Sequence, residues 1–398
     1  MLIAASRIVP ATGTHHGATI LAPGFVDCQA GRVTAIGAGP PPGRPDVELS
    51  DGLLLPGFVD LQVNGYFGVE LGDADDSGWT AVATRLTETG TTAFLPTFVT
   101  SPLDVTIGAL RRAAQFAPAM AGPDLTGANP VGARVLGVHL EGPFIARSRP
   151  GAHNPAWIIA PDPAAIDALL SAGSGLIRVM TLAPEVDGAL TAIKQLSEAG
   201  VLVSVGHSDA TAQQVSAAAT AGARMVTHLF NAQRGLHHRE PGVVGQALAD
   251  NRLTSSLIAD LHHVSAQVAA LAFRAAPGRI CLVTDAAACA GMPQGRYVLG
   301  GKPIELTAGD GTPPVRADGT LAGSALRMDA AMANMIAIGI RLPDAVAAST
   351  RIPADLIGRS DLGRISPGGA ADLTWLSDDL RAVATWVAGR QVHGPALG

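Results

Sequence analysis

The middle of this chain alternates short β-rich runs with alanine-rich segments of helical character. The β-rich runs number eight and lie at residues 57–63, 92–99, 134–140, 176–182, 201–206, 224–230, 254–261 and 279–285. Strands that alternate with helices form parallel βα units, and eight such units predict a closed (β/α)8 barrel. The alternative is an open, doubly wound sheet. We prefer the barrel because no Gly-x-Gly-x-x-Gly follows the first strand, and because polar residues follow many strands.

Two of the helical segments have recognisable ends. The segment "ALTAIKQLSEAG" stops at Gly200, and glycine is favoured just after the last residue of a helix. A second helix is predicted to start after Ser265, which can cap it. Its apolar residues at helical spacing, and therefore its expected buried face, are Val268, Leu271, Ala272 and Ala275.

The two ends of the chain differ from the middle. Residues 1–55 contain short β runs broken by Gly and Pro, and residues 357–398 read in the same way. Neither stretch is long enough for a comfortable core of its own. We therefore expect the two ends to pair into one small β-sandwich domain, beside a metal-dependent catalytic barrel formed by residues 56–356.

Composition limits the classes of function. Hydrophobic residues make up 47% of the 398 residues and charged residues 15%, as in a globular protein with much enclosed surface. The net charge of -6 argues against a nucleic-acid-binding face. We find no signal peptide and no apolar run long enough to span a membrane. Three cysteines without CxxC spacing indicate buried thiols in a reducing cytoplasm.

Polar residues at the ends of four predicted strands indicate the active site, because barrel strands deliver their last residues to one face. These residues are Glu141, His207, His228 and Asp285. The two histidines are 21 residues apart (228 − 207), about one βα repeat, so both rings can point to one place. A carboxylate with two imidazoles suits a Zn²⁺-type ion that keeps one position open for water. Asp285, free of the ion, could accept the proton of that water and pass it to a leaving nitrogen.

A structural role is the usual explanation for any one of these residues. A single histidine at a strand end is most often structural or solvated, and His139, inside its strand, is predicted to be a satisfied core histidine. Glu141 alone could be a turn carboxylate. Their joint occurrence after four separate strands favours a metal site. The first strand departs from this pattern, because Gln62 and Asn64 stand where two alternating histidines would serve a metal best. Neutral amides are poor substitutes for imidazole on a transition metal.

With these residues in place, the chain resembles the amidohydrolase superfamily and, within it, the N-acetylglucosamine-6-phosphate deacetylase family. The similar blocks extend over nearly the whole sequence and include "LLPGFVDLQVNG", "GVHLEGPFI", "GAHNP", "VSVGHSDAT", "THLFNAQ", "REPGVVG", "LIADLHHV", "LVTDAAACAG" and "LGRISPGGAADLTWL". The resemblance implies a barrel flanked by a β-sandwich. It also implies hydrolysis of N-acetyl-D-glucosamine 6-phosphate to acetate and D-glucosamine 6-phosphate.

The resemblance assigns roles residue by residue. It makes Glu141, His207 and His228 the metal ligands and Asp285 the catalytic acid/base. One divalent ion per subunit is implied, Zn²⁺ first and Fe²⁺, Co²⁺ or Mn²⁺ as alternatives, with Gln62 and Asn64 at a vestigial second-metal position. These amides could instead hydrogen-bond to neighbouring strand ends or to Asp285, and this is the role that we expect. The substrate contacts that it implies are His153, Asn231, Ala232, Arg239 and His263.

Arg239 matches an arginine that reaches the phosphate in the neighbouring subunit, so the resemblance implies a homodimer. In "ADLHHV" the choice of His263 over His262 rests on alignment. Two further arginines, Arg147 and Arg149, could be a second anion contact or simply solvated. The other functions left open are N-acetyl-D-galactosamine-6-phosphate deacetylation, hydrolysis of another N-acyl or cyclic amide, and a non-catalytic binding protein. The cyclic-amide enzymes generally need two metals, and no lysine stands at a strand end here.

Overall fold

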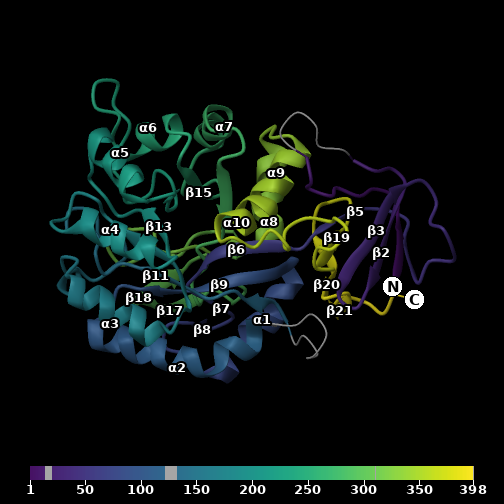
Figure 1. Cartoon of the computed structure of the whole chain (residues 1–398), viewed down its shortest axis with the longest axis horizontal. Coiled ribbons are helices and arrows are strands. Elements are labelled where there is room, and N and C mark those ends of the chain that lie inside the picture. The colour runs from purple at the N-terminus through teal and green to yellow at the C-terminus, as the bar shows by residue number, and fades with distance from the viewer. Residues whose placement is uncertain (14–19, 122–131, 310, 398) are drawn as a thin grey trace.

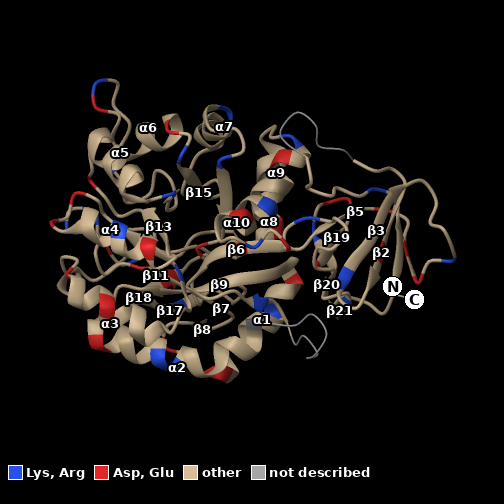
Figure 2. Cartoon of the chain, viewed as in Figure 1, with Lys and Arg blue, Asp and Glu red and all other residues tan. Residues whose placement is uncertain are grey.

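The computed structural model describes residues 1–13, 20–121, 132–309 and 311–397. Figure 1 shows a barrel surrounded by helices, with a smaller β-domain to one side that carries both chain termini. Figure 2 shows positive and negative residues interspersed over the outer helices and loops. Among the described residues we find no helix that combines the length and the apolar character needed to cross a membrane.

The barrel is built from parallel strands at all eight predicted places. Neighbouring strands pair in chain order, β6 with β9 and then onward to β16. A parallel bridge between Val63 and Ala286 joins the two ends of the sheet, so the barrel is nearly closed, the barrel prediction is confirmed and the open-sheet alternative is wrong. The strands are β6 (Phe58–Val63), β9 (Thr91–Val99), β10 (Arg134–Val135) with β11 (Val138–Glu141), β12 (Ile177–Leu182), β13 (Leu202–Val205), β14 (Met225–Val226), β15 (Thr254–Ile258) and β16 (Ile280–Val283).

Strands β10 and β11 are one predicted strand interrupted at Gly137. This residue has a φ of 136°, and a Cβ there would lie 2.4 Å from the carbonyl oxygen of Leu176, directly before the next strand. Only glycine fits so close an approach. The interruption precedes Glu141, which ends β11 at the carboxyl face of the barrel.

Helices cover the outside of the barrel (Figure 1). Gly200 follows helix α4 with a φ of 78°, as predicted. Helix α7 starts after Ser265 as predicted. Of its predicted buried face, Ala272 is buried, but Leu271 is 52% exposed, and Ala269 outside that face is buried instead. Alanines stand on several faces of this helix, so apolar spacing alone could not choose between them. The helices are α1 (Asp76–Leu86), α2 (Leu103–Ala121), α3 (Pro163–Gly173), α4 (Ala189–Glu198), α5 (Ala212–Ala221), α6 (Gly242–Ala249), α7 (Ala266–Ala275), α8 (Met328–Ala337), α9 (Leu342–Ser349) and α10 (Arg351–Leu356).

The smaller domain contains two four-stranded sheets drawn from both ends of the chain, as predicted. One has the order β3-β2-β1-β4 and the other β21-β20-β19-β5. Ile3, Leu54 and Trp386 belong to one buried cluster, so the two sheets pack face to face. The strands are β1 (Leu2–Ala5), β2 (Gly24–Gln29), β3 (Arg32–Ala38), β4 (Val47–Leu49), β5 (Leu53–Pro56), β19 (Leu373–Leu376), β20 (Ala382–Val387) and β21 (Arg390–His393).

Hydrophobic contacts and one buried ion pair join the small domain to the barrel. Leu53 and Leu362 fall within the predicted small domain but pack in the barrel's core cluster. The core therefore does not mark a sharp boundary between the two domains, and the predicted domain limits stay a prediction. The guanidinium of Arg134 in β10 donates from Nε and Nη2 to the two carboxylate oxygens of Asp372, over 2.8 and 3.1 Å. Both side chains are about 95% buried, at 5% and 3% exposure.

Two short antiparallel pairs complete the described structure. Strands β7 (Gly65–Tyr66) and β8 (Val69–Glu70) follow the first barrel strand, while β17 (Gly295–Leu299) and β18 (Lys302–Leu306) form a hairpin after the last. The β17–β18 hairpin matters for function, because Leu299 and Gly300 at its turn line the cavity at the barrel mouth. Two short 3-10 helices, Thr87–Thr89 and Pro155–Trp157, lie in loops.

Candidate active site

A cavity of about 480 Å³ opens at the carboxyl ends of the barrel strands, where the sequence predicts the active site. Glu141 ends β11, and His207, His228 and Asp285 each stand two residues beyond the end of a strand. All four line the cavity. Of the other predicted site residues, the cavity wall includes Asn64, His153, Asn231, Ala232 and His263.

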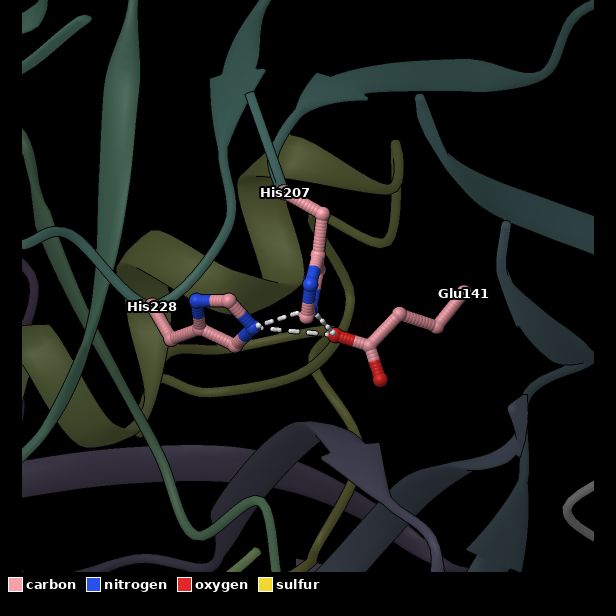
Figure 3. A group of neighbouring side chains, drawn as sticks. All are labelled: Glu141, His207 and His228. Carbon is pink, nitrogen blue, oxygen red and sulfur yellow. Dashed lines mark hydrogen bonds and ion pairs between the residues drawn. The ribbon is translucent and has the colours of Figure 1, made fainter. Parts of the chain in front are cut away.

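Three side chains converge on one point in this cavity (Figure 3). The Nε2 atoms of His207 and His228 lie 3.1 Å apart, and they lie 3.2 and 3.0 Å from Oε1 of Glu141. Ligand atoms bound to one tetrahedral Zn²⁺ at its usual bond lengths are about 3.3 Å apart. The spacing of the three atoms therefore fits a single divalent ion.

The hydrogen-bonding state of His207 strengthens this interpretation. Its Nδ1 lies 3.1 Å from the main-chain carbonyl oxygen of Arg149, which can only accept, so Nδ1 carries the hydrogen. Burial lowers the pKa of His207 to about 4, with the neighbouring His153 acting in the same direction. The ring is therefore neutral, and the lone pair on Nε2 faces the carboxylate of Glu141. A cation between them resolves this contact between two acceptors.

His228 responds to the same carboxylate. Burial lowers the pKa of His228, but the hydrogen bond and charge of Glu141 outweigh burial, and the net direction is upward. Burial raises the pKa of Glu141, but its contacts with the surrounding histidines, His153 first, outweigh burial, and the net direction is well below the usual value. A bound divalent ion would take the place of the proton that this arrangement favours.

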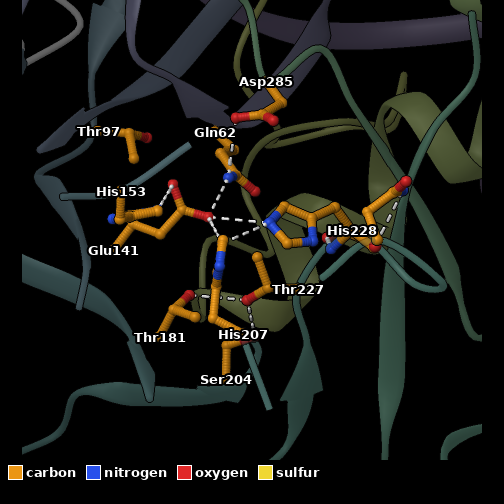
Figure 4. Close-up of polar contacts among 12 residues, drawn as sticks. Gln62, Thr97, Glu141, His153, Thr181, Ser204, His207, Thr227, His228 and Asp285 are labelled. Carbon is orange, nitrogen blue, oxygen red and sulfur yellow. Dashed lines mark hydrogen bonds and ion pairs between the residues drawn. The ribbon is translucent and has the colours of Figure 1, made fainter. Parts of the chain in front are cut away.

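Asp285 is held by two amides, that of Gln62 near the end of the first strand (Figure 4) and that of Asn64 directly after it. Gln62 donates from Nε2 to Oδ1 of Asp285 over 3.0 Å and to Oε1 of Glu141 over 2.9 Å. Asn64 donates from Nδ2 to the same Oδ1 over 2.7 Å. Oδ1 thus accepts two hydrogen bonds, which leaves Oδ2 as the oxygen available for proton exchange.

The environment of Asp285 suits an acid/base near neutral pH. Burial raises the pKa of Asp285 to about 6, and the negative charge of Glu141 adds to the rise. His228 and the hydrogen bond from Asn64 act in the opposite direction. A carboxyl group with a pKa close to the working pH can both accept and return a proton.

The amide side chains form the hydrogen bonds that the sequence offered as the alternative to metal binding. Their nitrogens face the carboxylates, so Gln62 bridges Glu141 and Asp285 in place of an ion. The oxygens Oε1 of Gln62 and Oδ1 of Asn64 are buried and have no partner among the described residues. The vestigial second-metal position stays a prediction.

His153 presents a hydrogen-bond donor to the same point. Its Nδ1 accepts from the main-chain N–H of Thr100 over 3.2 Å, so the hydrogen is on Nε2. That nitrogen lies 3.6 Å from Oε2 of Glu141. His153 is therefore placed to donate to an oxygen that approaches the three converging side chains.

The remaining predicted residues divide between the cavity and the surface. His263 lines the cavity, where its Nδ1 lies 2.6 Å from Oδ2 of Asp260, whereas His262 is exposed. Asn231 and Ala232 line the same cavity. Arg239 is exposed on the loop between β14 and α6, which projects near α5 in Figure 1, and it is not part of the described cavity wall.

Backbone conformation is the feature that sequence analysis missed. His207, His228 and Asp285 have φ angles of 47°, 29° and 52°, in the left-handed region that non-glycine residues seldom occupy. Strained residues of this kind cluster at functional sites. The strain turns each side chain into the cavity directly after its strand, and no residue type in the sequence announces it.

Two supporting residues, Thr100 and Asp260, were also missed, and one prediction about the core is confirmed. Thr100 acts through its main chain, which leaves no signal in the sequence, whereas Asp260 stands three residues before His263 and could have been found. His139 is fully buried, with Nδ1 at 3.1 Å from the Leu61 carbonyl oxygen and Nε2 at 2.8 Å from Oγ1 of Thr181. Thr181 and Ser204 both contact Oγ1 of Thr227 beneath the site (Figure 4).

Comparison with known proteins agrees with this geometry. A family model described as the amidohydrolase family matches residues 53–392. The chain belongs to the amidohydrolase family. Among curated members, N-acetylgalactosamine-6-phosphate deacetylase of Escherichia coli O157:H7 is 40% identical over 341 residues, which is 85% of this chain and 87% of that protein. N-acetylglucosamine-6-phosphate deacetylase of Bos taurus is 38% identical over 353 residues, 85% of this chain and 83% of that protein.

Solved structures place this amidohydrolase beside the same group. The crystal structure of N-acetyl-D-glucosamine-6-phosphate deacetylase from Mycobacterium smegmatis superposes with a TM-score of 0.90 at 34% identity, covering 99% of this chain and 100% of that one. An aspartate-to-alanine mutant of that enzyme, in complex with N-acetyl-D-glucosamine-6-phosphate, also gives a TM-score of 0.90, over 98% and 99% of the two chains.

Proposed function

We propose that this amidohydrolase removes acetate from N-acetyl-D-glucosamine 6-phosphate and releases D-glucosamine 6-phosphate. The observation that carries the proposal is the convergence of Glu141, His207 and His228 on one point, with the proton-exchanging oxygen of Asp285 beside it. Relatives at 34–40% identity over most of the chain bear the name of this activity or of its galactosamine counterpart.

Glu141, His207 and His228 are the residues that would hold the ion. A divalent ion held there would polarise the amide carbonyl of the substrate and lower the pKa of a water molecule. We propose Zn²⁺ first, because two imidazoles and a carboxylate suit it, with Fe²⁺, Co²⁺ or Mn²⁺ as alternatives.

The chain's own residues perform the proton transfers. The Nε2–H of His153 points to where negative charge develops on the amide oxygen, so it stabilises that charge without reorganising. Oδ2 of Asp285 accepts a proton from the attacking water and returns it to the leaving nitrogen. Gln62 and Asn64 keep Oδ1 occupied, so the proton stays on the oxygen that faces the substrate.

Asn231, Ala232 and His263 line the cavity, and we propose that they hold the sugar phosphate. Arg239 does not reach the cavity within this chain, so its proposed phosphate contact requires a second copy and implies a homodimer. Binding energy from the phosphate, which takes no part in the reaction, can hold the amide in its reactive position.

The cysteines support the predicted cytoplasmic location. Cys28, Cys281 and Cys289 are all buried and free, the state expected of thiols in a reducing compartment.

A deacetylation panel tests the function. Acetate release is measured with N-acetyl-D-glucosamine 6-phosphate, its galactosamine epimer and both unphosphorylated sugars, using metal-stripped and Zn²⁺-restored protein. We expect turnover of the glucosamine phosphate that is lost on stripping and regained on restoration. No acetate from any of the four sugars with the metal-loaded protein would refute the proposal and favour a binding protein.

N-acetyl-D-galactosamine 6-phosphate is the second candidate substrate, because the Escherichia coli relative at 40% identity bears that name. The same panel decides between the epimers by the ratio of kcat/KM. A cyclic-amide hydrolase with a lysine-bridged metal pair is disfavoured, because the described cavity wall contains no lysine.

A further inference from the structure

The described wall of the active-site cavity contains one arginine or lysine, Arg149. A sugar phosphate carries a negative charge of nearly two at neutral pH, and burial of such an anion requires compensating positive charges. We infer that Arg149 is a contact for the anionic end of the substrate supplied within the same chain. This inference rests on the proposed function and assigns part of its substrate specificity.

The guanidinium of Arg149 is held in a fixed orientation with one end unoccupied. Its Nε and Nη2 both donate to Oδ1 of Asp209, over 3.0 and 2.7 Å. Nη1 has no partner among the described residues, and the side chain is 39% exposed at the cavity. A planar guanidinium fixed by two of its nitrogens loses little freedom when the third binds an anion.

The carboxylate that orients Arg149 does not neutralise it alone, because Asp209 is shared. Arg234 donates to Asp209 from Nη2 over 3.0 Å and from Nε over 3.3 Å. The hydrogen bonds from Arg234 and Arg149 lower the pKa of Asp209 to about 2, so it stays ionised. The adjacent carboxylate of Glu185 accepts from the hydroxyl of Ser208 over 2.7 Å and from the main-chain N–H of Asp209. Two guanidiniums therefore share the Asp209 carboxylate, and Arg234 is also balanced by other carboxylates, since Asp209 first and then the charges of Glu240 and Glu185 raise the pKa of Arg234.

The position of Arg149 relative to the reacting atoms fits a remote phosphate. Its main-chain carbonyl accepts from Nδ1 of His207, on the ring edge that faces away from the three converging atoms. A Cβ on Gly151 would lie 3.0 Å from Cε1 of the same ring, so this loop packs directly on His207. The side chain of Arg149 extends from there to Asp209, two residues further along the chain than His207. The guanidinium thus lies away from the three converging ligand atoms but lines the same cavity.

Arg147, two residues earlier on the same loop, supplies a matched contrast. Its Nη1 and Nη2 donate to the carbonyl oxygens of Pro155 and Ile158, over 2.8 and 2.6 Å. Arg147 is not part of the described cavity wall. The sequence left the roles of both arginines undecided. In the structure, Arg147 hydrogen-bonds to the main chain of its own loop, whereas Arg149 lines the cavity.

The test compares Arg149→Met with Arg147→Met, since methionine keeps much of the length and removes the charge. The measured quantity is the ratio of kcat/KM for N-acetyl-D-glucosamine 6-phosphate to that for N-acetyl-D-glucosamine. We expect Arg149→Met to lower this ratio about ten- to hundredfold, the usual effect of losing a charge-assisted hydrogen bond. The loss should be mainly in KM for the phosphorylated sugar. Arg147→Met should leave the ratio unchanged.

An equal fall in kcat/KM for both sugars would overturn the inference, because it would show that Arg149 only holds the loop against His207. An unchanged ratio would overturn it as well. If Arg149→Met does not fold, the variant Arg149→Lys is used instead. Calorimetric titration then compares the affinity of Arg149→Lys for inorganic phosphate with that of the wild type. The inference then requires weaker phosphate binding to Arg149→Lys, which lacks the fork held by Asp209, and equal binding refutes it. This titration does not depend on turnover, so a protein inactive on all sugars refutes the proposed function without deciding the role of Arg149.

Discussion

Two buried groups of charged residues in this molecule are built in opposite ways. At the junction of barrel and sandwich, Arg134 and Asp372 pair through both carboxylate oxygens, and the N–H of Ala388 donates to Oδ1 of the same carboxylate over 2.7 Å. At the barrel mouth, Glu141 and Asp285 are both buried, and no arginine or lysine among the described residues bonds to either. The Nε2 atoms of His207 and His228 point at Glu141.

The difference separates residues selected for stability from residues selected for chemistry. A buried ion pair with its hydrogen bonds complete is costly to break on one side only. A buried carboxylate held by neutral amides carries a raised pKa, because its charged form is poorly compensated. The active site therefore sacrifices stability for reactivity, and the junction does not.

The largest expected effect comes from the acid/base. Asp285→Asn keeps the shape and the hydrogen bonds to Oδ1 but removes the proton-exchanging oxygen, so kcat should fall about 10²- to 10⁴-fold. Metal content, measured by atomic spectroscopy, should equal that of the wild type. The thermal midpoint should be no lower, because the substitution removes a poorly compensated buried charge. Near-normal turnover would remove Asp285 from the mechanism.

Removal of one partner at the junction should affect stability and spare catalysis. Asp372→Ala leaves the buried guanidinium of Arg134 unpaired, and the free energy of unfolding should fall by about 3–5 kcal/mol. Denaturant titration measures the loss, and kcat at low temperature should stay close to that of the wild type. The double variant Arg134→Met with Asp372→Leu is the control, since replacing both charges should recover much of the stability. A single variant as stable as the wild type would show that the pair contributes little.

The smallest effect concerns the pH dependence of catalysis. Asp285 must be ionised to accept a proton, so kcat should fall as the pH drops through the pKa of about 6 that burial gives this residue. The N–H of Asn64 favours the ionised form, and Asn64→Leu should therefore raise that pKa and move the acidic limb to higher pH. One hydrogen bond to a charged group corresponds to a movement of about one pH unit. A limb that stays in place or moves to lower pH would contradict the role given to Asn64.

The fold was largely predictable because its signals are local and repeated. Every barrel strand is a short apolar run, and helix ends such as the one at Gly200 follow from backbone preferences that need no tertiary context. The buried face of α7 was not predictable, because alanine is small enough to pack on any side. The domain limits could not be tested by the core either, because Leu53 and Leu362, on the small-domain side of both predicted boundaries, pack in the barrel's core cluster.

The site was predictable as a set of residue types and less so as a geometry. Glu141, His207, His228 and Asp285 could be chosen because each follows a strand, and parallel strands end on the same face. The hydrogen bonds that orient the histidines could not be predicted, because they come from main-chain atoms such as the N–H of Thr100 and the carbonyl oxygen of Arg149. Arg239 is exposed and outside the described cavity wall, so its predicted phosphate contact in a neighbouring subunit stays a prediction.

The left-handed backbone at His207, His228 and Asp285 restricts how this site can change over evolutionary time. Asparagine, aspartate and histidine adopt that conformation more readily than other non-glycine residues, whereas β-branched residues are strongly disfavoured. Mutational drift at these positions is therefore channelled toward other polar side chains that can still bind an ion or exchange a proton.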